Sequence, residues 1–424
     1  MPRTVWPKNL GWSGRLVWPL SLVRRAALAI ILLAAACAPL EERAQRAADG
    51  CALRCAPCPK CPGAAQPARA AARYEKTDFA ALPGWSSSVA APALRAFLIG
   101  CERVGRSGAL GSACARAQGI ASGDEVEDRV RRFFETAFDP YAVVAGDGAD
   151  SGLITGYYEP ILPGRRAHSQ AYRVPVFGVP QDMIVVDLSA VHPDLKHRRL
   201  RGRIAGRTLV PYYSRAEIER RNTQFEAPVL AWVADPVALF FLQIQGSGQI
   251  AFEDGTRLRL GYADQNGHPY RSLGRALVER GELQLEDASM QGIQAWAAAN
   301  PEKLRAALDV NPSYVFFRVL PEAPPRQGPI GALGVPLTAE ASLAVDRRFI
   351  PLGAPVYLAT THPLSSTPLE QLMVAQDTGG AIRGAVRADL FWGTGPAAGT
   401  KAGRMRQQGR LWLLWPRGVS LPQR

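Results

Sequence analysis

The sequence predicts a mainly β protein with some α-helix, and three observations support this class. Short runs bounded by Pro and Gly, with many β-branched and aromatic residues, recur from Gly152 to the end of the chain. Apolar residues at helical spacing are confined to two regions, 91–134 and 270–308. Strands and helices do not alternate without interruption, which argues against a doubly wound parallel sheet. The 424 residues are 47% hydrophobic, which is enough apolar mass for two cores.

The predicted elements follow the chain in the order helices, strands, helices, strands. The predicted helices are Ala91–Val104, one beginning at the capping box Ser122–Glu125, Tyr270–Glu282, Ser289–Ala299 and Pro301–Leu308. The predicted strands are Gly152–Leu162, Tyr172–Val179, Met183–Leu188, Thr208–Tyr213, Val229–Val233, Ala238–Ile244, Gln249–Phe252, Tyr314–Val319, Ala354–Ala359, Leu372–Gln376 and Arg410–Leu414. A hairpin is expected with its turn at Asp254-Gly255.

The first 36 residues are typical of an export signal. Arg24 and Arg25 precede an apolar run, 26–36, that is too short to cross a bilayer but has the length of a signal-peptide core. Cys37 follows small residues, as in a bacterial lipobox, so we expect it to be lipidated. Ordinary cleavage at the alanines before it is the alternative. Residues 37–73 are rich in Ala, Pro and Cys and are predicted to be a tether.

Export implies an oxidising compartment, so disulfides are the expected state of the remaining cysteines. Cys101 and Cys114 flank a Gly/Ser-rich loop and are predicted to form a disulfide between two helices. Cys51, Cys55, Cys58 and Cys61 crowd the tether; disulfides and a zinc site both stay open for them.

The formal net charge of +13 suits an anionic partner. Nucleic acid, anionic lipid headgroups and the carboxylates of peptidoglycan stem peptides all carry such charge. The sequence has no zinc-finger spacing, no helix-turn-helix signature and no basic cluster interleaved with aromatics, so we do not expect nucleic-acid binding.

Carboxylates are the best candidates for chemistry. The five histidines lack the spacing of a metal pair, and Gly246-Ser247-Gly248 lacks the frame of a serine nucleophile. Asp346, Asp377 and Asp389 instead lie among apolar runs and glycines, where burial raises a carboxyl pKa and can keep an acid protonated. Aspartates at such places also cap turns, so any one of the three has a structural alternative.

Five ordered motifs resemble those of the membrane-bound lytic murein transglycosylase A family, and the resemblance covers roughly residues 74–416. The first four are Gly156–Pro160 (GYYEP), Gln243–Gly248 (QIQGSG), Gly261–Ala263 (GYA) with Gly267–Ser272 (GHPYRS), and Asn311–Phe317 (NPSYVFF). The fifth, at the C-terminal end, resembles that family's "3D" domain, which is named for three aspartates. They correspond to Asp346, Asp377 and Asp389, with Gly379–Ile382 and Gly393–Pro396 also matching.

The resemblance implies a double-psi β-barrel domain interrupted by a second, smaller β-rich domain, with the substrate groove between them. The barrel would take residues 74–160 and 325–424, and the inserted domain residues 161–324. The implied reaction cleaves peptidoglycan glycan strands between N-acetylmuramic acid and N-acetylglucosamine and leaves 1,6-anhydro ends. Asp389 would act first as acid and then as base, Asp377 would be its helping neighbour and Asp346 a structural partner.

The resemblance also directs the choice of glycan contacts, because aromatic faces stack on sugars and polar groups bind hydroxyls and carboxylates. The expected contacts are Tyr157, Tyr158, Gln245, Gly246, Ser247, Gly248, Tyr262, Tyr270, Arg271, Gly379 and Gly380. No cofactor and no metal are expected. We expect a lipoprotein of the Gram-negative outer membrane that faces the periplasm and joins cell-wall enzyme complexes.

Two other hypotheses remain open. In one, Asp377 activates a water and Asp389 is the acid, as in an inverting hydrolase with two carboxyls. In the other, the chain is a murein-binding lipoprotein without catalysis, and the aspartates only hold sugar hydroxyls.

Overall fold

The computed structural model describes residues 72–105, 108–120, 126–192, 195, 200–322, 327–363 and 365–422. The predicted export signal, Cys37, nearly all of the tether and the capping box at Ser122 lie outside these residues. Within the described ranges, no helix is both long and apolar enough to span a membrane. The fold is a strand-dominated mixture of β and α, which confirms the predicted class at that level.

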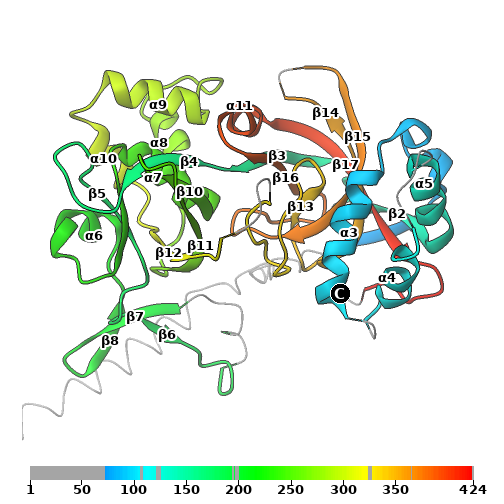
Figure 1. Cartoon of the computed structure of the whole chain (residues 1–424), viewed down its shortest axis with the longest axis horizontal. Coiled ribbons are helices and arrows are strands. Elements are labelled where there is room, and N and C mark those ends of the chain that lie inside the picture. Colours follow the sequence, from blue (N-terminus) through cyan, green and yellow to red (C-terminus); the bar gives the residue numbers. More distant parts are fainter. Residues whose placement is uncertain are drawn as a thin grey trace, which may run out of the picture. The chain divides into compact units, whose positions relative to one another are not determined.

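The larger sheet combines strands from both ends of the described chain. Its strands, in spatial order, are β1 (Ala72–Lys76), β2 (Phe138–Ala145), β17 (Arg406–Pro416), β14 (Pro355–Thr361), β15 (Pro368–Asp377), β13 (Ser342–Val345), β16 (Ala388–Thr394) and β3 (Gly152–Glu159). β17 also pairs antiparallel with β3, so it has three strand neighbours. In Figure 1 the blue N-terminal strands accordingly lie among the orange and red C-terminal ones.

The second sheet is built from the middle of the chain. Its six strands, in spatial order, are β12 (Val315–Val319), β11 (Arg257–Gln265), β10 (Ser247–Ala251), β4 (Ile161–Arg165), β9 (Val229–Val233) and β5 (Val174–Phe177). The predicted turn at Asp254-Gly255 joins β10 to β11: Thr256 N donates to Asp254 Oδ1 (2.9 Å), and Gly255 has a φ of 80°. Leu162, Ile250 and Phe317 contribute to its buried apolar face.

The predicted strand Gly152–Leu162 is two strands in two sheets. β3 ends at Glu159 in the larger sheet, and β4 begins at Ile161 in the second. Pro160 separates them, because it has no N–H to donate to a continuing ladder. The prediction of one strand was wrong for this reason, and the chain passes between the sheets at Pro160 (Figure 1).

The predicted strand Ala238–Ile244 is also wrong, since these residues lie in helix α7 (Pro236–Gln245). Asp235 caps this helix by accepting from Val237 N (2.7 Å), Pro236 takes the first turn, and Gly246 ends it at a φ of 78°. The run is apolar on most sides, so its period does not distinguish a buried strand from a buried helix. The Asp-Pro start and the Gly end were the missed signals.

Most other helices cover the sheets at the predicted places. Their bounds are α3 (Ala91–Val104), α4 (Gly111–Ala117), α5 (Val126–Ala137), α6 (Arg215–Arg221), α8 (Leu273–Glu279), α9 (Met290–Ala299), α10 (Leu304–Leu308) and α11 (Pro396–Arg404). The sequence did not predict α4, α6 or α11. A disulfide joins Cys101 of α3 to Cys114 of α4, with the Cα atoms 5.5 Å apart.

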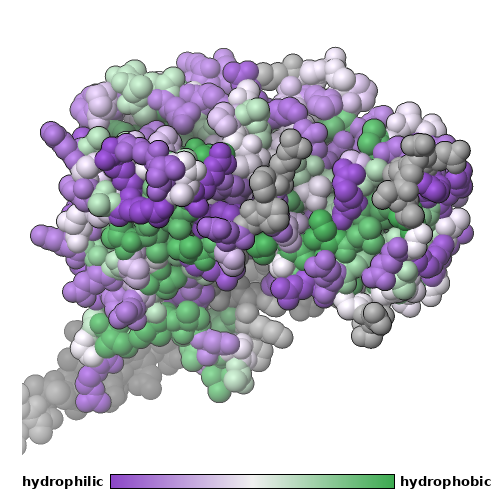
Figure 2. All heavy atoms as spheres, in the orientation of Figure 1, coloured by the Kyte–Doolittle hydropathy of each residue, from purple (hydrophilic) through white to green (hydrophobic). Residues whose placement is uncertain are grey.

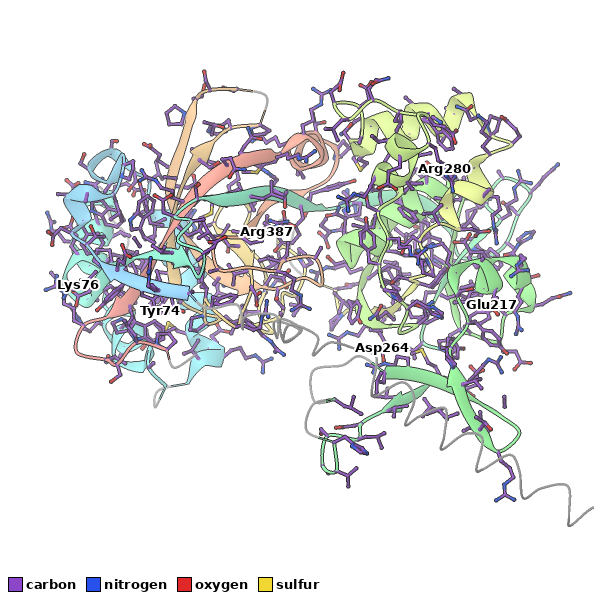
Figure 3. The ribbon with its side chains drawn as sticks, turned by 180° about the vertical axis from the view of Figure 1, so that it is seen from behind. Tyr74, Lys76, Glu217, Asp264, Arg280 and Arg387 are labelled. Atoms are coloured by element: carbon purple, nitrogen blue, oxygen red, sulfur yellow. A yellow bond between two sulfur atoms is a disulfide. The ribbon has the colours of Figure 1, made fainter. Side chains whose placement is uncertain are left out.

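A small three-stranded sheet, β6 (Ile184–Val186), β7 (Leu200–Ala205) and β8 (Thr208–Pro211), stands apart from the other two. Arg201 of β7 attaches it to the second sheet by an ion pair with Asp264 (2.9 Å), and Figure 3 shows Asp264 at this junction. Ile204 and Leu209 are 57% and 43% exposed, and the apolar side chains over β7 and β8 are visible in Figure 2.

We predict that the double substitution Cys101→Ser with Cys114→Ser lowers the free energy of unfolding by about 3 kcal/mol, because a short loop loses its covalent closure. Urea unfolding followed by circular dichroism measures this. Reductant should bring the wild type to the stability of the variant and leave the variant unchanged. Equal stability of oxidised wild type and variant would contradict a stabilising bridge.

Candidate functional site

Asp389 lies on β16 and points to the face opposite the core. Its neighbours Ala388 and Leu390 are fully buried, so the alternation of the strand turns Asp389 the other way. β16 runs parallel to β3 and places Asp389 beside Thr155. Thr155 Oγ1 donates to Asp389 Oδ1 (2.7 Å).

Arg387, two residues before Asp389 on the chain, completes this group. Its Nη2 donates to Thr155 Oγ1 (2.8 Å), and Figure 3 shows the side chain beside β3. A guanidinium can only donate, so Thr155 accepts from Arg387, and its own hydrogen goes to Asp389 when that carboxyl is ionised. The direction of the chain Arg387 to Thr155 to Asp389 follows from these donor and acceptor roles.

Burial raises the pKa of Asp389 from 3.8 to about 6, and the nearby carboxylate of Asp377 adds to the increase. The hydrogen bond from Thr155 and the positive charge of Arg387 act in the opposite direction. The side chain nevertheless retains partial solvent exposure. A carboxyl with these properties can hold a proton near neutral pH and still reach a ligand.

Asp377 ends β15 and faces the same group. Its Oδ2 accepts from Tyr157 Oη (3.0 Å), and its Oδ1 accepts from the backbone N–H groups of Ala332 (2.8 Å) and Thr378 (2.9 Å). Burial raises the pKa of Asp377, although these three hydrogen bonds oppose the increase. Tyr157 and Thr155 are two residues apart on β3 and share a face, so that one face of this strand contacts both carboxyls.

Asp346 directly follows β13 of the larger sheet and is 2% exposed. Arg348 pairs with it (2.5 Å) and Gly384 N donates to it (3.0 Å). Burial alone would raise the pKa of Asp346, but these hydrogen bonds outweigh burial and lower it. No hydrogen bond joins Asp346 to either other aspartate within the part of the chain that the structure describes.

The expected glycan contacts fall in different places. Tyr158, Gln245 and Tyr270 line a cavity of about 210 Å³ that also involves α8, α9 and α11, and none of the three aspartates lines it. Tyr158 alternates with Tyr157, so this cavity lies on the face of β3 opposite the aspartates. Gln245 Oε1 accepts from Tyr158 N (3.1 Å).

The remaining expected contacts differ in their solvent exposure. Arg271 and Gly380 are exposed, Tyr262 is 39% exposed, and Gly246, Ser247 and Gly379 are partly buried. Gly248 is buried, and a Cβ there would lie 2.8 Å from Pro160 O and still closer to Leu242. Packing therefore already requires glycine at position 248, whether or not a ligand approaches.

Sequence reasoning missed Thr155 and Arg387. Each lies two residues from a residue that it did select, Tyr157 and Asp389, and side chains two apart on a strand share a face. That spacing was the available signal. In the described ranges no group of three or more His, Cys, Asp or Glu residues could hold a metal ion.

Comparison with known proteins gives consistent matches. Residues 153–318 match the model of the MltA specific insert domain, and residues 341–415 match that of the 3D domain. The chain is 35% identical to membrane-bound lytic murein transglycosylase A of Escherichia coli strain K12 over 291 residues, 67% of this chain and 71% of the relative.

Solved structures agree with this similarity. MltA from Neisseria gonorrhoeae is 39% identical with a TM-score of 0.72, covering 83% of this chain and 95% of that one. Escherichia coli MltA with bound chitohexaose is 27% identical with a TM-score of 0.57, covering 81% of this chain and 94% of that one.

We predict that Asp389→Asn stabilises the folded protein at neutral pH. Because the folded pKa of Asp389 is raised from 3.8 to about 6, its contribution to stability is complete below pH 4 and is lost as the pH rises through 6. The loss is up to about 3 kcal/mol, and asparagine does not incur it. Thermal melts should show the variant equal to wild type at pH 3.5 and more stable at pH 7. Asp150→Asn, at an exposed aspartate, is the control expected to follow wild type at both pH values.

Proposed function

Because the chain belongs to the membrane-bound lytic murein transglycosylase A family, we propose that it is a lytic transglycosylase of peptidoglycan. It would cleave the β-1,4 bond between N-acetylmuramic acid and N-acetylglucosamine and form 1,6-anhydro-N-acetylmuramic acid ends. The observation that carries this proposal is the carboxyl of Asp389, whose pKa of about 6 suits an acid that must also become a base.

In the proposed reaction one carboxyl acts twice. Protonated Asp389 gives its proton to the glycosidic oxygen as the bond from C1 of N-acetylmuramic acid breaks. The C6 hydroxyl of the same sugar attacks C1, and the Asp389 carboxylate takes the hydroxyl proton. The acid is regenerated and no water is consumed. Since attack occurs within one sugar, no second molecule has to be positioned.

Thr155 and Arg387 would assist the middle step of this reaction, in which Asp389 is ionised. The hydrogen bond from Thr155 and the charge of Arg387 favour the ionised form of Asp389, which exists after the proton has left. Burial favours the protonated form needed at the start. The balance of these effects supports a carboxyl that can exchange its proton in both directions.

Asp377 would be a helper of Asp389, as the sequence suggested. Both of its oxygens already accept hydrogen bonds, from Tyr157, Ala332 and Thr378, which leaves little capacity to activate a water. Its charge would raise the proton affinity of Asp389. Asp346, paired with Arg348, would hold the neighbouring loops in place.

The proposed substrate is the glycan strand, consistent with the chitohexaose bound to the Escherichia coli relative. Tyr157 lies on the face of β3 that is turned toward Asp377 and Asp389. Tyr158, Gln245 and Tyr270 line the cavity on the other face. We assign the glycan backbone to the first face. The other expected contacts, Gly246, Ser247, Gly248, Tyr262, Arg271, Gly379 and Gly380, remain proposals.

We further propose that the larger sheet is a double-psi β-barrel of residues 74–160 and 325–424, interrupted by the domain 161–324. The division of strands between the two sheets and the extra pairing of β17 with β3 support this. The relatives described as membrane-bound support a place in the Gram-negative envelope. We also propose that Cys37 is lipidated, that the protein lies at the outer membrane and that it joins cell-wall enzyme complexes.

Digestion of purified peptidoglycan sacculi tests the reaction. Mass spectrometry should find 1,6-anhydro ends with the wild type, and Asp389→Asn should lower the rate by about 10²- to 10⁴-fold while still binding sacculi in a pull-down. Asp150→Asn should keep wild-type activity. Reducing ends in place of anhydro ends would indicate a hydrolase, and unchanged lysis by Asp389→Asn would refute the role of Asp389.

The pH dependence of the reaction rate tests the role of Thr155. The rate should fall as the pH rises above about 6, since Asp389 must be protonated to act as acid. Thr155→Val removes a hydrogen bond to the carboxylate, so it should move this fall upward by about one pH unit. Thr155→Ser keeps the hydroxyl and should leave it in place. A shift to lower pH in Thr155→Val would contradict the assignment.

A further inference from the structure

Glu159 is a fully buried carboxylic acid that the reaction above does not use. It is the last residue of β3, immediately before Pro160 carries the chain from the larger sheet into the second. Its side chain has no solvent exposure. Glutamate is rarely buried to this extent without a role for its oxygens.

One oxygen of this carboxyl joins the two sheets. Glu159 Oε2 accepts from Thr394 Oγ1 (2.8 Å), at the end of β16 in the larger sheet. The same atom accepts from Gln249 Nε2 (2.8 Å), on β10 of the second sheet. The backbone strengthens the junction, since Gly395 N donates to Glu159 O (2.9 Å) and Gln249 N donates to Pro160 O (2.8 Å).

The other oxygen, Oε1, is buried without a hydrogen-bond partner among the described residues. Burial raises the pKa of Glu159, although the bonds from Thr394 and Gln249 and the charges of Arg259 and Arg257 oppose the increase. Both hydrogen bonds of this carboxyl go to Oε2. An oxygen of a carboxyl group has two lone pairs, so Oε2 can accept both bonds.

The position of this junction connects it to the chemistry. β16 carries Asp389 five residues before Thr394, and β10 begins at Ser247, next to the expected glycan contacts Gln245 and Gly246. Any rotation at Pro160 would move the acid relative to residues of the second sheet. Other side-chain bonds support the junction: Tyr158 N donates to Gln245 Oε1 (3.1 Å), and Tyr158 Oη donates to Met290 Sδ (3.3 Å). A further bond runs from Gln291 Nε2 to Gly399 O (3.4 Å).

We propose that Glu159 is a positioning residue, which holds the strand bearing Asp389 against the edge of the second sheet so that a glycan touching both meets the acid. The inference rests on the proposed transglycosylase function. It assigns to Glu159 the alignment of the two sheets and no contact with the substrate. The needed property is an acceptor oxygen shared by Thr394 and Gln249.

Steady-state digestion of sacculi by the full-length protein tests this. Glu159→Ala should lower kcat per folded molecule by roughly 10- to 100-fold, since misplacement by an ångström is enough for such a loss, while sacculus binding in a pull-down changes little. Glu159→Gln keeps an acceptor oxygen and should restore most of kcat. Val130→Ala, in the core of α5 and remote from the junction, controls for lower stability alone.

A double-mutant cycle separates alignment from local packing. Thr394→Val removes the bond to β16 and Gln249→Leu the bond to β10. If Glu159 acts as a bridge, either change breaks the alignment and the double variant is no slower than the slower single one. Multiplied effects, or a normal kcat in Glu159→Ala, would overturn the proposal. Absence of anhydro products from the wild type would instead refute the underlying function.

Discussion

The parallel pairing of β3 with β16 is the constraint on which the site depends. It brings Thr155 to Asp389 across 234 positions of sequence and sets Tyr157 against the end of β15 on the same face. The opposite face of β3 packs under α11, where a Cβ on Gly399 would meet the ring of Tyr158 at 2.9 Å. One strand therefore supplies the surroundings of both carboxyls on one side and a tightly packed support on the other.

In this site, burial and hydrogen-bond donors shift the pKa values of the carboxyls in opposite directions. Burial favours the protonated forms of Asp377 and Asp389, whereas Tyr157, Thr155 and Arg387 favour the ionised forms. The pKa of Asp346, in the same region of the sheet, shifts the opposite way, because hydrogen bonds from Arg348 and Gly384 lower it despite burial. The pKa values of three aspartates in similar sequence settings thus shift in different directions, because burial dominates for two of them and hydrogen bonds dominate for Asp346.

Local pattern predicted the β-rich class, most strands of the second sheet and the Asp254-Gly255 turn. It failed where two signals compete. The apolar run of α7 has no clear period, and the strand across Pro160 reads as continuous because both halves are apolar. The aspartates could be chosen from family motifs. For Thr155 and Arg387 the sequence offered only their two-residue spacing from Tyr157 and Asp389, since their role exists only when β3 and β16 pair. Strands β1, β2, β7, β13 and β16 were not predicted. β13 has only four residues, and Asp389 and Gly393 interrupt the apolar pattern of β16.

The position of β17 has a consequence for how the protein matures. This strand is the last in the chain, and it pairs with β2, β14 and β3 at once. During synthesis from the N-terminus, the second sheet has all its strands well before β17 emerges. The larger sheet, with the surroundings of Asp389, is completed only once β17 has been made. The surroundings of Asp389 are therefore among the last parts of this fold to be completed.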